Sequence, residues 1–123
     1  MGTFQDQTAV VTGAATGIGR AIAAALAREG AQVALWDKDS TTLSETVEQL
    51  RSEGHRVTAH VVDVADRTSV IAAIAALHET FSTPVSLLVN NAIDAQPAGG
   101  NLGRSSQSFI LVWQVGTAVR NAL

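Results

Sequence analysis

The stretch that most constrains the fold of this chain is TAVVTGAATGIG, at residues 8–19. It begins with the apolar run 9–11, which is rich in β-branched residues and typical of a strand buried on both faces of a sheet. A turn then contains the glycines Gly13, Gly17 and Gly19. Apolar residues recur with helical spacing over 18–26. The stretch therefore predicts a strand, a glycine-rich turn and a helix in direct succession.

This arrangement favours binding of a diphosphate group. Free N–H groups at the start of a helix carry partial positive charge, and glycines let an anion approach the backbone closely. The glycine spacing is G-x-x-x-G-x-G rather than the better-known G-x-G-x-x-G of dinucleotide sites. The alternative is a tight strand-to-helix turn that binds no ligand.

Beyond this stretch, strands and helices alternate. Apolar runs at 32–36, 56–62 and 85–89 predict three further strands, and segments with helical periodicity separate them. Strands that alternate with helices imply parallel βαβ units with right-handed connections. We expect one domain, in which residues 1–92 form these units and residues 93–123 add a loop and a C-terminal helix.

Composition excludes several classes of function. With 46% hydrophobic and 15% charged residues the chain is globular, and a net charge of −3 makes nucleic acid an unexpected partner. It has no cysteine, no apolar run near the roughly 20 residues of a membrane span, and no signal-peptide core at its start. Its three histidines lack metal-ligand spacing, so we expect no metal site. We expect a cytoplasmic protein.

Asp37 ends the second predicted strand, 18 residues after Gly19. In a dinucleotide site an acid at this point accepts hydrogen bonds from the adenosine ribose and repels a 2′-phosphate, which favours NAD over NADP. Lys38 weakens this preference, because a lysine can meet a 2′-phosphate. The alternative is that Asp37 only caps the next helix.

Asp63 and Asn90 also stand at the carboxyl ends of predicted strands, where open α/β sheets bind ligands. Either residue alone could simply form a turn. Together with the glycine turn and Asp37, they place four polar features along one edge of the sheet.

These residues, in this order, resemble the short-chain dehydrogenase/reductase family. The matching segments are TGAATGIG at 12–19, Asp37, Asp63-Val64 and Asn90-Asn91-Ala92. The resemblance covers about residues 7–92. It implies an α/β fold, a partial Rossmann doubly wound parallel sheet of about four strands in the order 3-2-1-4, with helices on both faces. It also implies an oxidoreductase that transfers hydride between NAD and an alcohol or ketone.

By this resemblance the glycine turn holds the pyrophosphate, Asp37 the adenosine ribose, and Asp63 with Val64 the adenine, while Asn90 and Ala92 flank the cofactor. With Lys38 added, the candidate cofactor-binding residues are Gly13, Ala15, Thr16, Gly17, Ile18, Gly19, Asp37, Lys38, Asp63, Val64, Asn90 and Ala92.

The sequence departs from the family after Ala92. Ile93 replaces the usual glycine, there is no tyrosine, and Lys38 is the only lysine, so the family's catalytic Tyr-x-x-x-Lys has no counterpart. We therefore expect a cofactor-binding half with little turnover alone and no catalytic residue of its own. The alternative is a non-catalytic fragment that binds NAD or ADP-ribose, or that self-associates through the exposed edge of its fourth strand.

Overall fold

The computed structural model describes residues 4–81 and 83–91. In chain order its elements are β1 (Thr8–Thr12), α1 (Gly17–Arg28), β2 (Gln32–Asp37), α2 (Ser40–Ser52), β3 (Val57–Val61), α3 (Arg67–Thr80) and β4 (Val85–Asn90). The predicted alternation of strands and helices is confirmed, and each strand boundary differs from the predicted one by at most one residue. Ala92 and the loop and helix expected within 93–123 lie outside the described residues.

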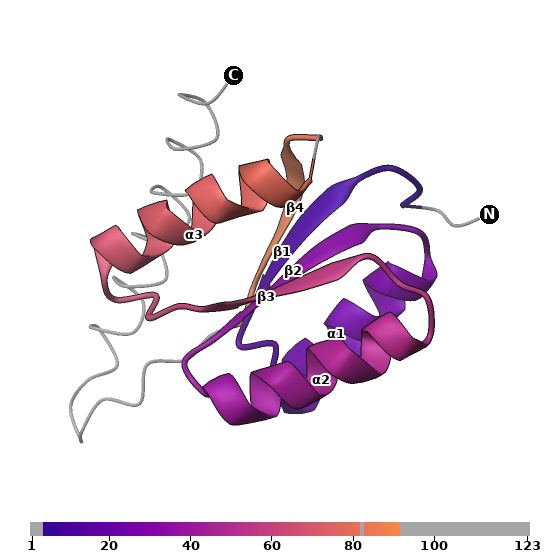
Figure 1. Cartoon of the computed structure of the whole chain (residues 1–123), viewed down its shortest axis with the longest axis horizontal. Helices are drawn as coiled ribbons and strands as arrows, with labels where there is room; N and C mark the ends of the chain where they lie inside the picture. The colour runs from indigo at the N-terminus through magenta and orange to yellow at the C-terminus, as the bar shows by residue number, and fades with distance from the viewer. Residues whose placement is uncertain (1–3, 82, 92–123) are drawn as a thin grey trace.

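The strands form one sheet in the order β3-β2-β1-β4, and all three neighbouring pairs are parallel. The predicted order is therefore confirmed. The chain moves outward from β1 through β2 to β3, and α3 then carries it back so that β4 lies on the other side of β1. Helices α1 and α2 cover one face of the sheet and α3 covers the other (Figure 1). The strand order thus reverses between β1 and β4, and such a reversal opens a crevice at the carboxyl ends of the strands.

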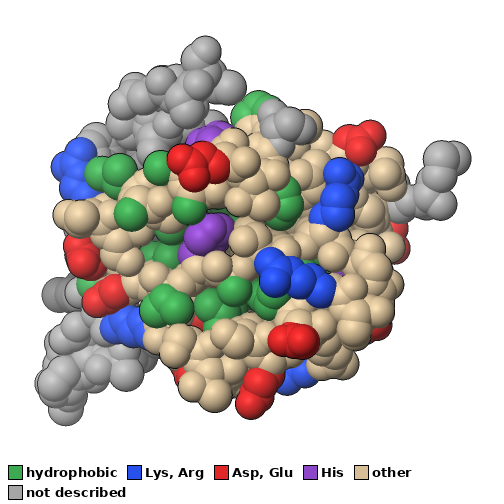
Figure 2. Space-filling view, viewed as in Figure 1, with side chains coloured by type: hydrophobic (Ala, Val, Ile, Leu, Met, Phe, Trp, Pro, Cys, Tyr) green, Lys and Arg blue, Asp and Glu red, His purple; other side chains and the backbone are tan. Residues whose placement is uncertain are grey.

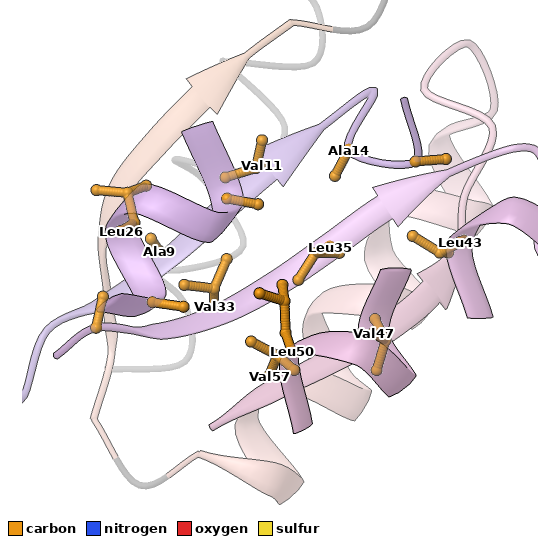
Figure 3. Packing of buried hydrophobic residues seen from close by; sticks show 14 residues of the cluster. Ala9, Val11, Ala14, Leu26, Val33, Leu35, Leu43, Val47, Leu50 and Val57 are labelled. Atoms are coloured by element: carbon orange, nitrogen blue, oxygen red, sulfur yellow. The ribbon is translucent and has the colours of Figure 1, made fainter. Parts of the chain in front are cut away.

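Two apolar clusters hold the helices onto the sheet, and β1 contributes to both. Because side chains alternate along a strand, Ala9 and Val11 face α1 and α2, whereas Val10 faces α3. Figure 3 shows the first cluster, in which Leu43 of α2 and Leu26 of α1 pack with the side chains of β1 and β2. The second cluster includes Trp36, which is fully buried under α3, as expected for a core residue.

Aspartates cap the second and third helices. The Asp39 carboxylate accepts a hydrogen bond from the Thr42 N–H at 3.1 Å, and the Asp66 carboxylate accepts one from the Thr68 N–H at 3.0 Å. These bonds satisfy N–H groups that have no partner inside the helix. Hydrogen bonds from Thr42 also lower the pKa of Asp39.

The surface carries mixed charge. On the face shown in Figure 2, acidic and basic side chains are interspersed, and hydrophobic side chains gather over α3 and beside β3. Within residues 4–81 and 83–91, no helix combines the length and the apolar character that crossing a bilayer requires.

Candidate functional site

Polar residues from all four strands meet at one edge of the sheet. The register places Thr12 beside Trp36 and Asn90, and Asp37 beside Val61, so the strands end at nearly the same level. The segments that follow each strand therefore lie along a common rim. The four polar features that the sequence predicts at one edge are in fact together there.

The turn between β1 and α1 is open on one side and tightly packed on the other. Gly13 and Gly17 have positive φ angles of 64° and 61°, which only glycine adopts at little cost. A Cβ added at Gly17 would meet no atom of the described residues within 4 Å, whereas one at Gly19 would lie 2.0 Å from the carbonyl oxygen of Gly13. Gly17 therefore leaves space beside the backbone, and Gly19 allows α1 to pack against the start of the turn.

The amino end of α1 differs from those of α2 and α3. Its cap residue, Thr16, makes no side-chain capping bond to the described residues, whereas aspartates cap the other two helices; none of the three helices has an acid in its first turn. The helix therefore presents uncompensated N–H groups and their partial positive charge at the rim. Ile18, in the same turn, has 72% of its surface exposed, which is unusual for so apolar a side chain.

Asp37 bridges the end of β2 and the glycine turn. Its Oδ2 accepts a hydrogen bond from the Ala15 N–H at 3.0 Å, and its Oδ1 accepts one from the Asp39 N–H at 3.0 Å. The carboxylate is half-buried and is held in one orientation at the rim. Because Asp39 is the residue that caps α2, helix capping does not account for Asp37.

Lys38 and Asp63 join the ends of β2 and β3. The Lys38 Nζ lies 3.5 Å from the Asp63 Oδ1, which also accepts the Ala65 N–H at 2.9 Å. Both side chains of the ion pair are about half exposed, so the pair adds little stability but does orient Asp63. Val64 is only 9% exposed and packs in the cluster under α3, which leaves its backbone, rather than its side chain, at the rim.

Hydrogen bonds tie the end of β4 to the glycine turn. The Thr12 hydroxyl donates to the Asn90 Oδ1 at 3.2 Å and accepts the Asn91 N–H at 2.9 Å. The Asn91 Nδ2 donates to the Gly13 carbonyl at 3.3 Å. Asn90 is therefore at the rim, and its neighbour Asn91 is the residue that braces the turn.

Sequence reasoning missed two of the residues that hold the turn. The family motif includes Asn91, but nothing in its spacing indicates a contact with Gly13, and Thr46 of α2 belongs to no motif. The Thr46 hydroxyl donates to the Ala15 carbonyl at 3.2 Å, and Thr46 is 1% exposed. One signal in the sequence could have pointed to Thr46: it is a threonine whose helical spacing places it among the apolar residues on the buried side of α2.

The histidines do not gather with other possible ligands. Within the described parts of the chain, no group of three or more His, Cys, Asp or Glu residues could hold a metal ion. His60 lies beside Trp36 in the register of β2 and β3, and burial lowers its pKa.

Comparison with known proteins gives a consistent family. Residues 7–101 match the family described as short chain dehydrogenase. A relative from Streptomyces violaceoruber is 46% identical over 91 residues, which are 74% of this chain and 33% of the relative. Its name proposes that it is ketoacyl reductase 1 of the granaticin polyketide synthase. Oxidoreductase UcpA of Escherichia coli K12 is 44% identical over 92 residues, 75% of this chain and 34% of the relative.

Solved structures of short-chain dehydrogenases and ketoreductases resemble the fold of this chain. An actinorhodin polyketide ketoreductase with NADPH matches with a TM-score of 0.82 and 30% identity, over 97% of this chain and 49% of that chain. A short-chain dehydrogenase/reductase from Burkholderia phymatum in complex with NAD matches with a TM-score of 0.81 and 30% identity, over 97% of this chain and 46% of that chain. This chain thus spans about one third of the length of its curated relatives and about half of these solved chains. It belongs to the short-chain dehydrogenase/reductase family.

Proposed function

We propose that this chain binds NAD along the carboxyl ends of its strands, with the pyrophosphate at residues 13–19 and the adenosine ribose at Asp37. The observation that carries the proposal is the hydrogen bond between the Asp37 carboxylate and the Ala15 N–H, which brings an acceptor for ribose hydroxyls next to the glycine turn. In a nucleotide the ribose and the phosphates are neighbouring groups. A ribose acceptor beside the glycine turn therefore supports the proposal that one ligand reaches both parts of the site.

The turn suits a diphosphate in shape and in charge. The open space at Gly17 lets an anion reach the backbone, and the amino end of α1 supplies N–H groups with partial positive charge. Thr16 and the exposed Ile18 lie at the same end of the helix and would contact the cofactor. The side chain of Ala15 is fully buried, so its share in binding would come from its backbone.

The charges at the end of β2 favour NAD over NADP. The Asp37 carboxylate would repel a 2′-phosphate placed on the ribose that it binds. Lys38, the nearest cation in the sequence, already pairs with Asp63, and a 2′-phosphate would have to compete with that carboxylate. The similar solved structures include both NAD and NADPH complexes, so this preference rests on the residues of this chain alone.

The adenine would lie between the ends of β2 and β3. Asp63 offers a carboxylate there, and Val64 offers its backbone because its side chain is in the core. Asn90, at the end of β4, would lie toward the nicotinamide side of the site. In this proposal, most of the described polar groups at the rim bind the adenosine half of the dinucleotide.

The reaction we propose for the whole site is hydride transfer between the nicotinamide and an alcohol or ketone. The bound cofactor supplies the hydride chemistry, and the described residues bind and orient it. The sequence holds no tyrosine and only one lysine, which lies at the adenosine end. We therefore assign the described residues to cofactor binding and not to proton transfer.

A second candidate function is binding of ADP-ribose without catalysis. It is favoured by the placement of the glycine turn, Asp37 and Asp63, which all address the adenosine half. If this half provides nearly all of the binding energy, ADP-ribose will bind about as tightly as NAD. A large advantage of NAD over ADP-ribose would contradict this candidate and would indicate additional contacts to the nicotinamide.

The test is calorimetric titration with NAD, NADP and ADP-ribose. We expect NAD and ADP-ribose to bind and NADP to bind at least about tenfold more weakly, as the loss of a hydrogen bond to a charged group implies. Asp37→Ala should weaken NAD by about the same factor and remove the preference over NADP. Glu48→Gln, which removes one negative charge from an exposed position on α2, is the matched control and should bind like the wild type. Absence of binding by NAD and ADP-ribose at millimolar concentration would overturn the proposal.

A further inference from the structure

Ala15 is held at both of its backbone polar groups by residues from different elements. Its N–H donates to the Asp37 Oδ2 at 3.0 Å, and its carbonyl oxygen accepts the Thr46 hydroxyl at 3.2 Å. One residue earlier, the Ala14 N–H donates to the Trp36 carbonyl at 3.1 Å. The middle of the glycine turn is thus fixed to β2 on one side and to α2 on the other.

Thr46 lies where the packing alone calls for an apolar residue. It is 1% exposed and shares the buried side of α2 with Leu43, Val47 and Leu50. A valine has nearly the same shape, and it would avoid burying a hydroxyl, which is unfavourable unless the hydroxyl is hydrogen-bonded. The hydroxyl is therefore explained by its bond to the Ala15 carbonyl and not by filling of the core.

Because the peptide unit is planar, the hydrogen bond to the Ala15 carbonyl also fixes the direction of the Thr16 N–H. The carbonyl of Ala15 and the N–H of Thr16 belong to one planar trans peptide unit, in which the two groups point in opposite directions. When Thr46 draws the Ala15 oxygen toward α2, the Thr16 N–H is aimed away from α2. Thr16 is the exposed cap residue of α1, at the point where the proposed function places a diphosphate.

We propose that Thr46 is a positioning residue for the phosphate-binding turn. It touches no ligand, but it fixes the orientation of the peptide between Ala15 and Thr16, and hence the direction in which the turn presents its N–H groups. This inference rests on the proposed function, because it assumes that those N–H groups bind phosphate.

The test compares substitutions of Thr46 with a control at another buried threonine. Thr46→Val removes the hydroxyl and keeps the branched shape, whereas Thr46→Ser keeps the hydroxyl. Thr8→Val is the control, because Thr8 is fully buried and its hydroxyl bonds to that of Thr83, at the opposite end of β1 from the turn. Affinities for ADP-ribose and adenosine are measured by NMR titration, and urea unfolding of each variant shows that it is folded.

We expect Thr46→Val to weaken ADP-ribose by about fivefold, the value of one hydrogen bond, and to leave adenosine within about twofold. Thr46→Ser should restore ADP-ribose binding, and Thr8→Val should bind both ligands like the wild type. Amide exchange at Thr16 and Gly17 should accelerate in Thr46→Val and remain unchanged in Thr8→Val. If Thr46→Val does not fold, Thr46→Ala removes the hydroxyl and places no γ-methyl group in its position.

Three results separate the possible failures. If the wild type binds ADP-ribose and Thr46→Val binds it equally well, the positioning role is wrong and the proposed function stands. If Thr46→Val and Thr8→Val lose the same affinity, or if adenosine weakens as much as ADP-ribose, Thr46 acts through general stability and the inference is again wrong. If the wild type binds neither ligand, the proposed function itself has failed.

Discussion

Replacing Gly19 with alanine tests how tightly α1 packs against the glycine turn. Alanine is the better helix former, so in an ordinary helical position the change would stabilise the protein by up to about 1 kcal/mol. At Gly19, however, the new Cβ would lie 2.0 Å from the Gly13 carbonyl oxygen and 2.7 Å from the Asn91 Nδ2. The first of these neighbours is backbone, which cannot move out of the way by a side-chain rotation. We therefore expect the substitution to be destabilising.

The magnitude follows from what must move. An ordinary carbon–oxygen contact is more than 1 Å longer than the 2.0 Å found at Gly19, so the start of α1 and Gly13 must separate. Such overpacking costs about 1–3 kcal/mol, and loss of the hydrogen bond from Asn91 to Gly13 adds about 0.5–1.5 kcal/mol. After subtracting about 1 kcal/mol for the gain in helix propensity, we expect a net loss of about 0.5–3.5 kcal/mol. For a chain of this size that is a fall in Tm on the order of 3–20 °C.

The assay is urea unfolding followed by circular dichroism, combined with ADP-ribose titration. Ala25→Gly, at an exposed position in the same helix, calibrates the helix propensity and should destabilise by about 1 kcal/mol. Gly19→Ala should destabilise despite its favourable propensity and should also weaken ADP-ribose, because the turn is displaced. A Gly19→Ala protein as stable as the wild type, with unchanged affinity, would refute the close packing of α1 against Gly13.

Three further changes have defined outcomes. Lys38→Met should change the free energy of unfolding by less than about 1 kcal/mol, because both partners of its ion pair are half exposed, and should weaken NADP more than NAD in calorimetric titration. Burial lowers the pKa of His60 below 6.5, so the unfolded chain binds this proton more readily than the folded chain. The contribution of His60 to stability is therefore fully present above pH 6.5 and falls as the pH drops below that value. Urea midpoints compared between about pH 5 and 8 should fall less in His60→Gln than in the wild type. Leu77→Ala, at a core position that is 1% exposed, should cost about 2–5 kcal/mol in urea unfolding.

Most of the fold could be predicted from the sequence because its signals are local. The run 9–11 has the apolar, β-branched composition of a doubly covered strand, and Asp39 and Asp66 are the kind of residue that caps a helix. The alternation of elements then limits the sheet to parallel pairs, and the family resemblance supplied the strand order. The exact register could not be predicted: β1 and β4 slip between Thr8 and Ala9, where packing across the sheet decides the pairing.

The candidate site was predictable to the extent that its residues follow strands directly. Asp37 and Asp63 could be placed at one edge from strand order alone. The bonds that orient them could not, because they join positions distant in sequence, as Asn91 and Gly13 do across 78 residues. Thr46 was the hardest to find, since its helical spacing marks it as a core position and only the structure shows that its hydroxyl reaches the turn.

These bonds give the buried side of α2 a part in the site. The turn between β1 and α1 consists of two alanines between Gly13 and Thr16, and Thr16 makes no side-chain capping bond to the described residues. The N–H groups of the turn therefore keep their direction only if neighbouring elements hold the backbone. Asp37 holds one side of Ala15, Thr46 holds the other, and Asn91 holds Gly13. The buried face of α2 therefore does more than cover the sheet. A substitution there that preserves volume but removes the hydroxyl should weaken ADP-ribose and leave adenosine nearly unchanged, which packing alone would not produce.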